Sequence, residues 1–89
     1  LIQKARGDLD GAEEMYKKSL AIEEKLGHLE GMASDYGNLG LVFQARGDLD
    51  GAEELYKKSL EIGNKSGFKE IIEIAERNLE LLNSEREKK

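Results

Sequence analysis

The sequence contains no cysteine and no proline, and each absence excludes something. Without cysteine there are no disulfides, no thiolate nucleophile and no cysteine-based zinc site, which fits a reducing compartment. Without proline, nothing forbids long helices. No apolar run approaches the roughly 20 residues that span a bilayer, and no signal peptide opens the sequence. We therefore expect a cytoplasmic protein without a membrane partner.

Concentrated positive charge is also missing. The 14 Lys and Arg residues are outnumbered by 19 Asp and Glu, which gives a net charge of −5. Nucleic-acid binding requires a concentrated basic face, whereas the lysine pairs here stand close to acidic residues. We expect no nucleic-acid partner. With 89 residues, of which 37% are charged, the chain is suited to one small unit of solvated helices.

The sequence shows no set of catalytic residues. Glu13-Glu14 and Glu53-Glu54 are adjacent acids, and neighbours in sequence do not share a helix face, so they cannot act as a paired acid and base. His28 is the single imidazole, and one histidine with scattered glutamates is weak evidence for a metal site. There is no Gly-rich phosphate loop. We expect no enzymatic activity, no metal and no cofactor.

Repetition is what the sequence does have. The ten residues ARGDLDGAEE occur at 5–14 and again at 45–54, a spacing of 45 − 5 = 40 residues. The pentapeptide YKKSL follows each copy, at 16–20 and at 56–60. A fixed period between about 20 and 50 residues is the signature of a repeat architecture, in which each unit stacks on its neighbour.

Each period holds two amphipathic helical patterns. In both, apolar or small residues recur at the i, i+3, i+4, i+7 spacing of a helix face. The first stripe consists of Met32, Tyr36, Leu39, Gly40 and Phe43. The second consists of Ala52, Leu55, Tyr56, Ser59, Leu60 and Ile62. A glycine inside a helix costs about 1 kcal/mol relative to alanine, so we expect a close helix contact at Gly40.

Glycines separate the helical patterns. We expect helix breaks near Gly7, Gly27, Gly47 and Gly67. Gly47 is suited to the left-handed end of one helix, and Asp48 or Asp50 to the cap of the next. We interpret the tripeptide Arg-Gly-Asp, at 46–48 and again at 6–8, as this turn. An adhesion signal would need an extended exposed loop, and the sequence shows no secretory feature.

The pattern Tyr36-x-x-Leu39-Gly40-x-x-Phe43, followed by Gly47-Asp48 and Ala52-x-x-x-Tyr56, resembles the tetratricopeptide repeat. The resemblance implies an all-α solenoid of antiparallel helix hairpins, with about four helices. We divide the single 1–89 unit into a partial first repeat (1–27), a full repeat (28–67) and a C-terminal capping helix with a charged tail (68–89).

The forty-residue period departs from the family's usual period of about 34 residues. Long repeats of this kind resemble those of kinesin light chain and of the adaptor family that binds Inscuteable-like partners. Both are peptide-binding scaffolds. The resemblance therefore implies a protein–protein interaction scaffold, which binds a peptide or partner segment in the concave groove lined by the first helix of each repeat. The alternative is a structural spacer or self-assembly module with no foreign peptide ligand.

Small and amide-bearing side chains lie opposite the apolar stripe of the first helix, where they would face such a groove. The candidate peptide-binding residues are Ser34, Gly37, Asn38, Leu41, Gln44, Arg77 and Asn78. Amide side chains both donate to and accept from a peptide backbone, and Asn38 and Asn78 resemble two rungs of the asparagine ladder of the long-repeat relatives. An ordinary solvated polar face is the alternative. Cationic residues that clamp a C-terminal carboxylate in one subfamily are missing from the corresponding positions.

The two ends differ in kind. Segment 70–86 looks like a third first helix, but Glu80 stands where Gly40 stands one period earlier (80 − 40 = 40). We expect a terminal cap, whose apolar face is buried on Leu55, Leu60 and Ile62. At the other end Leu1-Ile2 begins in mid-helix, so residues such as Met15 lose part of their cover. We expect self-association through this open end.

Overall fold

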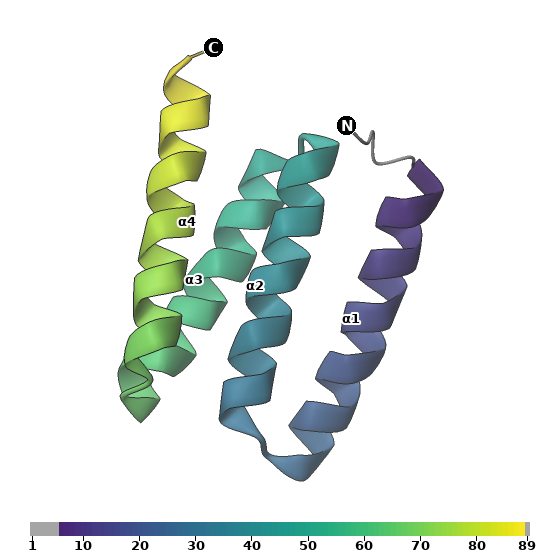
Figure 1. Ribbon diagram of the computed structural model, residues 1–89, viewed down its shortest axis with the longest axis vertical. Coiled ribbons are helices and arrows are strands. Elements are labelled where there is room, and N and C mark those ends of the chain that lie inside the picture. The colour runs from purple at the N-terminus through teal and green to yellow at the C-terminus, as the bar shows by residue number, and fades with distance from the viewer. Residues whose placement is uncertain (1–5, 89) are drawn as a thin grey trace.

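The computed structural model describes residues 6–88, and this range holds four α-helices (Figure 1). They are α1 (Arg6–Leu26), α2 (Leu29–Arg46), α3 (Leu49–Ser66) and α4 (Lys69–Glu87). The described range contains no strand. The all-α prediction is therefore confirmed, and so is the assignment of two helices to each period.

Three glycines end the first three helices. Gly27, Gly47 and Gly67 have φ angles of 73°, 91° and 74°, in the left-handed region that side chains with a Cβ avoid. At the middle turn, the backbone N–H groups of Gly47 and Asp48 donate to the carbonyls of Gln44 and Phe43, both at 2.9 Å. Asp48 then caps α3, because its Oδ1 accepts the N–H of Gly51 at 2.9 Å. These breaks and the cap at Asp48 are confirmed.

The turn expected at Arg6-Gly7-Asp8 is wrong. Helix α1 begins at Arg6, so Gly7 lies in its first turn and Arg6-Gly7-Asp8 forms part of a helix. The turn at Gly47 depends on the carbonyls of a preceding helix, which its N–H groups reach. The corresponding residues, 1–5, lie outside the described range, as does the expected mid-helix start at Leu1-Ile2.

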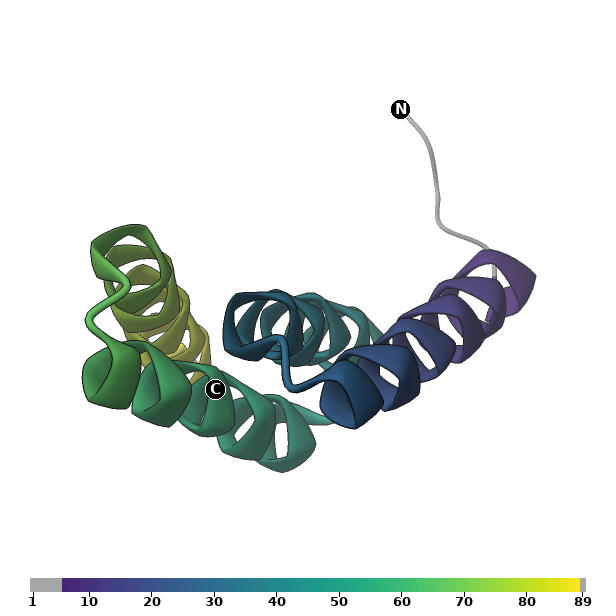
Figure 2. The same cartoon turned by 90° about the horizontal axis from the view of Figure 1, so that it is seen from below.

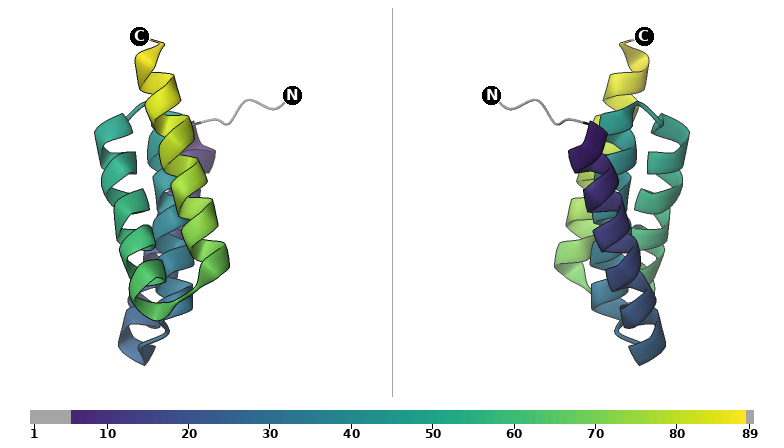
Figure 3. Two further views of the ribbon diagram at one scale, coloured as in Figure 1. Left: turned by 90° about the vertical axis from the view of Figure 1, so that its left-hand side faces the viewer. Right: turned by 90° about the vertical axis from the view of Figure 1, so that its right-hand side faces the viewer.

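Consecutive helices run antiparallel and form two layers. Seen end-on, α2 and α4 lie in one layer, and α1 and α3 in the other (Figure 2). The side views show the long axes of all four helices in roughly the same direction (Figure 3). Each helix packs against the next one in the chain, and α2 also contacts α4. This zigzag is what stacked helix hairpins require.

The core lies where α3 meets both α2 and α4. Tyr56 is 0% exposed, and it forms one cluster with Ala52 and Leu82. A Cβ built on Gly40 would lie 2.5 Å from Cε1 of the Tyr56 ring, so the close contact expected at Gly40 is confirmed. Because Gly40 and Ala52 leave room for this ring, the phenyl group of Tyr56 fills the space between the three helices.

The structure places the residues that were expected to be buried under the capping helix only partly out of solvent. Leu55, Leu60 and Ile62 are half-buried, whereas the buried positions of α3 are Ala52, Tyr56, Ser59 and Gly63. Small residues dominate this face because α2 and α4 both approach it closely. A Cβ on Gly63, for example, would lie 3.1 Å from Cγ2 of Ile71.

Helix α2 is packed on two sides rather than along one stripe. Its buried residues are Ala33, Asp35, Leu39, Gly40 and Val42. Met32, Tyr36 and Phe43, which the periodicity placed in the core, are half-buried. Since α1 covers one flank of α2 and α3 the other, the buried arc is wider than a single stripe. Asp35 lies inside it, where its Oδ2 accepts the hydroxyl of Ser19 at 2.8 Å.

An arginine clamp joins neighbouring helices once in each period. Each arginine contacts one aspartate and one glutamate, as Arg46 with Asp10 and Glu13, and as Arg86 with Asp50 and Glu53. A hydrogen bond from Lys17 and a second from Arg46 lower the pKa of Glu13. Arg86 and Lys57 lower the pKa of Glu53 in the same way. Helix α4 continues to Glu87, so most of the expected charged tail is helical and Arg86 is bound within the fold.

Candidate functional site

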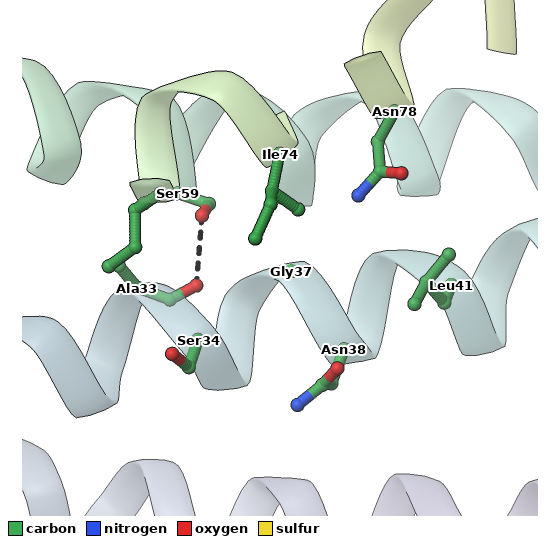
Figure 4. Close-up of a pocket in the computed structure, with 9 residues that line it drawn as sticks. Ala33, Ser34, Gly37, Asn38, Leu41, Ser59, Ile74 and Asn78 are labelled. Carbon is green, nitrogen blue, oxygen red and sulfur yellow. Dashed lines mark hydrogen bonds between the residues drawn. The ribbon is translucent and has the colours of Figure 1, made fainter. Parts of the chain in front are cut away.

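The space between α2 and α4 is positioned by the repeat. Both are first helices of a period, and each begins two residues after a left-handed glycine, at Leu29 and at Lys69. They lie side by side in one layer (Figure 2). Between them is a cavity of about 160 Å³, which we name the α2–α4 groove (Figure 4).

Five of the seven predicted site residues line this groove together. They are Ser34, Gly37, Asn38, Leu41 and Asn78. Figure 4 shows Asn78 and Ile74 pointing from α4 towards α2, where Gly37 carries no side chain that would block the space. Side chains that lie forty residues apart in the sequence are thus brought to one cavity.

The floor of the groove was not predicted. Ser59, buried on α3, donates its hydroxyl to the carbonyl of Ala33 at 2.9 Å (Figure 4). A Cβ on Gly37 would lie 3.8 Å from Oγ of Ser59, an ordinary contact distance. Ser59 therefore ties α3 to α2 directly beneath the cavity. A small polar residue in an otherwise apolar helix stripe was the available signal.

The rim of the groove is apolar. Leu41 is 49% exposed and Ile74 is 56% exposed. Ile71 also lines the cavity and is buried. The groove thus combines exposed aliphatic groups with two carboxamides, and none of its lining residues is charged.

Gln44 and Arg77 do not line the groove. The hydroxyl of Tyr56 donates to Oε1 of Gln44 at 2.7 Å, and Nε2 of Gln44 donates to Oε1 of Glu85 at 2.8 Å. Burial, with a smaller contribution from Glu85, raises the pKa of Tyr56 to about 12. Gln44 thus joins α2, α3 and α4 within the fold, while Arg77 is exposed on α4.

A second cavity, of about 400 Å³, lies on the other side of α2. Leu9, Ala12 and Tyr16 of α1 line it, together with Asn38 and Leu41 of α2. The two cavities therefore share Asn38 and Leu41. The sequence predicted only that residues of this end such as Met15 lose part of their cover, and it indicated no cavity between α1 and α2.

Within residues 6–88, no three His, Cys, Asp or Glu side chains gather in a way that could hold a metal ion. None of the described helices is long and apolar enough to cross a membrane.

Comparison with known proteins gives one match. The chain matches the tetratricopeptide repeat family over residues 1–65, a range that includes all of α1 and α2 and nearly all of α3. No curated protein and no solved structure matches the chain. The matched range covers well over half of the sequence, and the antiparallel helix hairpins agree with it. The chain belongs to the tetratricopeptide repeat family. Membership of this family suggests a scaffold for protein–protein interactions.

Proposed function

We propose that this scaffold binds an extended peptide segment of a protein partner in the α2–α4 groove. The observation that carries the proposal is the convergence of five predicted residues on one cavity, from two helices that occupy equivalent places in the repeat. Asn38 and Asn78 are themselves equivalent, since 78 − 38 = 40.

The chemistry of the groove suits a peptide backbone with aliphatic side chains. Each asparagine offers two donors and an acceptor, which is what successive backbone amide groups require. One water needs a cavity of only about 10–15 Å³, so a cavity of about 160 Å³ has room for one aliphatic side chain. That side chain would lie between Leu41 and Ile74.

The groove is not suited to a C-terminal carboxylate. Gly37, Leu41, Ile74 and Asn78 stand where one subfamily places cationic clamps, and none of them carries a positive charge. We therefore propose an internal peptide segment as the ligand. The forty-residue period supports this proposal by its resemblance to kinesin light chain and to the Inscuteable-binding adaptors.

A selection from a random library of linear peptides, followed by fluorescence anisotropy with the selected peptides, tests the proposal. Replacing both asparagines (Asn38→Ala with Asn78→Ala) removes several hydrogen bonds of about 0.5–1.5 kcal/mol each. We expect affinity to fall about tenfold or more, since 1.4 kcal/mol corresponds to a factor of ten. Helicity should be unchanged. The matched control is Asn64→Ala with Asn83→Ala, two exposed asparagines that do not line the groove.

Three outcomes would contradict the proposal. Equal affinity for the wild type and the Asn38/Asn78 variant would place the ligand elsewhere. A library that yields no binder would favour the structural spacer or self-assembly module. If Asp8→Glu with Asp48→Glu abolished binding in a protein that keeps its helicity, the Arg-Gly-Asp tripeptides would be interpreted as an adhesion signal instead.

A further inference from the structure

We propose that the peptide bound in the α2–α4 groove carries a basic residue, best an arginine, four positions from the aliphatic residue that fills the groove. The basic side chain occupies a separate cavity at the N-terminal ends of α2 and α4. This inference rests on the proposed function, and it adds the charge and the residue spacing of the ligand.

The separate cavity lies beside the turns that precede α2 and α4. Its volume is about 550 Å³, and we name it the turn cavity. Side chains from α1, from the beginning of α2 and from the turn before α4 line it, among them Glu23, His28, Leu29, Glu30, Ser34 and Phe68. His28 and Phe68 are equivalent residues, since 68 − 28 = 40, and each directly precedes a first helix. The repeat therefore brings an imidazole and a phenyl ring to the same cavity.

The turn cavity continues the α2–α4 groove along one side of α2. Ser34 lines both of them. Leu41, Asn38 and Ser34 follow one another along α2 at intervals of three or four residues (Figure 4), which places them on one helix face. Glu30 comes four residues before Ser34 on the same face. A peptide that follows this face from the groove towards the N-terminus of α2 therefore enters the turn cavity.

Helix geometry sets the spacing between the two sites. An α-helix rises about 1.5 Å per residue, so Glu30 lies about 12 Å along the axis from Asn38 and about 16 Å from Leu41. The aliphatic residue of the peptide would lie between these two levels. An extended peptide rises about 3.3 Å per residue, so four residues cover about 13 Å. Side chains four positions apart also point to the same face of an extended peptide, whereas those three or five apart do not.

The charges of the turn cavity favour a cation. Glu23 and Glu30 line it, and no lysine or arginine is among the described residues that do. The N-terminus of α2 acts in the opposite direction, because its dipole is equivalent to about half a positive charge. Two carboxylates outweigh this partial charge, and Glu30 lies in the first turn of α2, where it offsets the dipole directly. The net charge of −5 for the whole chain acts in the same direction as the carboxylates.

The carboxylate of Glu23 is already held in position. Its Oε1 lies 3.0 Å from Nδ1 of His28. Its Cδ lies only 2.5 Å from a Cβ built on Gly31, so the absence of a side chain there lets the carboxylate lie against α2. The side chain of Glu23 is 27% exposed. A ligand that pairs with it does not have to order a freely moving side chain, which lowers the entropic cost of binding.

The remaining lining suits the long stem and the planar head of arginine. Leu29 is 46% exposed and Phe68 is half-buried. The methylene groups of an arginine can cover such apolar surface while its guanidinium stays near water. A guanidinium also stacks on aromatic rings and forms two parallel hydrogen bonds with a carboxylate. Lysine offers the charge without this planar geometry, so we expect arginine to bind more tightly.

The experiment starts from the peptides that the library selection yields. Among the selected sequences, arginine and lysine should be enriched four positions from an aliphatic residue, relative to the starting library. One such peptide is then synthesised with arginine, with citrulline or with glutamate at that position. Citrulline keeps the shape of arginine and removes its charge. Ion pairs near a protein surface are weak, so fluorescence anisotropy should show a loss of about two- to fivefold for citrulline and a larger loss for glutamate.

Protein variants locate the charge that the peptide meets. Glu30→Gln should weaken the arginine peptide by about two- to fivefold and leave the citrulline peptide unchanged. Glu70→Gln is the matched control, because Glu70 occupies the equivalent position in the first turn of α4, is exposed and does not line the turn cavity. Glu30→Lys should reverse the preference, so that the glutamate peptide binds more tightly than the arginine peptide. Circular dichroism verifies that each variant keeps its helicity.

The possible failures are distinguishable. A library without any binder would overturn the proposed function and this inference together. Peptides that require Asn38 and Asn78 but bind equally well with arginine and with citrulline would support the groove and overturn the basic residue. Equal losses for Glu30→Gln and Glu70→Gln would assign the effect to net charge and not to the turn cavity. A Glu30→Gln loss that is as large for the citrulline peptide would mean that Glu30 acts through the structure of α2, which would also overturn the inference.

Discussion

The two helix hairpins use the same turn but opposite chemistry at their junctions. Between α1 and α2, the carboxylate of Glu23 covers Gly31, because a Cβ on Gly31 would lie 2.5 Å from Cδ of Glu23. Between α3 and α4, the small residue lies on the earlier helix and the large residue on the later helix. The glycine is now Gly63 on the earlier helix, and Ile71 on the later helix covers it at 3.1 Å. Both pairs are separated by one period, since 63 − 23 = 40 and 71 − 31 = 40.

At each junction the space left by a glycine is filled by a side chain of the other helix. One large and one small side chain meet at each junction, and either helix can provide the large one. The two junctions differ in the polarity of the side chains that fill them. Oε1 of Glu23 lies 3.0 Å from Nδ1 of His28 at the first junction, whereas the second junction is built from aliphatic groups. We therefore expect the second hairpin to contribute more to the free energy of unfolding.

The largest effect should come from the tyrosine at the centre of each hairpin. Tyr56 is fully buried, so Tyr56→Ala removes a large aromatic group and should cost about 3–5 kcal/mol in the free energy of unfolding. Tyr16 is half-buried, so Tyr16→Ala should cost clearly less. Urea denaturation of the two variants measures the difference. Equal losses would mean that the two hairpins are equally covered.

Overpacking at the contact with Tyr56 should have the next largest effect. Gly40→Leu introduces atoms where the Tyr56 ring already lies 2.5 Å from a Cβ, and should destabilise the protein by about 1–3 kcal/mol. Leucine has the better helix propensity, so the sign of the change is informative. Gly11→Leu, in open space, is the control and should not destabilise. A Gly40→Leu variant that is as stable as the wild type would show that the contact is loose.

Local periodicity made most of the fold predictable. The apolar stripes predicted two helices in each period, the glycines predicted the turns at Gly27, Gly47 and Gly67, and the cost of a helical glycine pointed to Gly40. The total of about four helices was implied by the resemblance to the tetratricopeptide repeat. The turn expected at Arg6-Gly7-Asp8 was wrong, because these residues form the first turn of α1.

The candidate site was predictable only where it follows from helix faces. Asn38 and Asn78 line one groove because equivalent residues of stacked helices lie side by side. Gln44 shares nearly the same face, yet its amide is bound to Tyr56 and Glu85. The contact with Glu85 joins residues 41 positions apart, and no local pattern indicates it. The reversal of sizes between the pairs Glu23–Gly31 and Gly63–Ile71 is likewise visible only when both junctions are compared in space.

A third prediction tests the exchange at the junctions directly. Gly31→Ile places a branched side chain where the end of the flexible Glu23 side chain lies, so Glu23 must move aside and the single substitution should destabilise by about 1 kcal/mol, the low end of the range for overpacking. Adding Glu23→Gly recreates the size pair of the second junction and should recover much of this loss. The coupling free energy from the double-mutant cycle should fall between about 0.5 and 3 kcal/mol.

The cycle has a built-in comparison. The reverse change at the second junction, Gly63→Glu with Ile71→Gly, places a carboxylate in an aliphatic environment and should not be recovered to the same extent. If Gly31→Ile and Glu23→Gly were simply additive in urea denaturation, the two side chains would not be coupled. The size rule inferred for the junctions would then be wrong.

The smallest effect should come from the arginine clamp, an interhelical contact that both hairpins share. The pKa values of Glu13 and Glu53 lie below their ordinary value of 4.5 in the folded protein, because lysine and arginine neighbours stabilise the carboxylates. A carboxyl group with a lowered folded pKa contributes stability that is present above its unfolded pKa and is lost as the pH falls through the folded pKa. Stability should therefore decline as the pH falls below about 4.5.

Arg46→Gln and Arg86→Gln should each flatten this acid dependence and lower the melting temperature slightly at pH 7. The two shifts should be similar, because each arginine contacts one aspartate and one glutamate in the same geometry. Thermal melts between pH 2 and pH 7 measure them, with Lys18→Gln as the control, since Lys18 and Glu14 form a looser pair at 3.8 Å between exposed side chains. Both arginine effects should shrink in about 1 M salt, where the Debye length is about 3 Å. A much larger shift for Arg86→Gln would mean that the clamp of the second hairpin also supports the neighbouring bond between Glu85 and Gln44, so that the hairpins differ even in the contact they share.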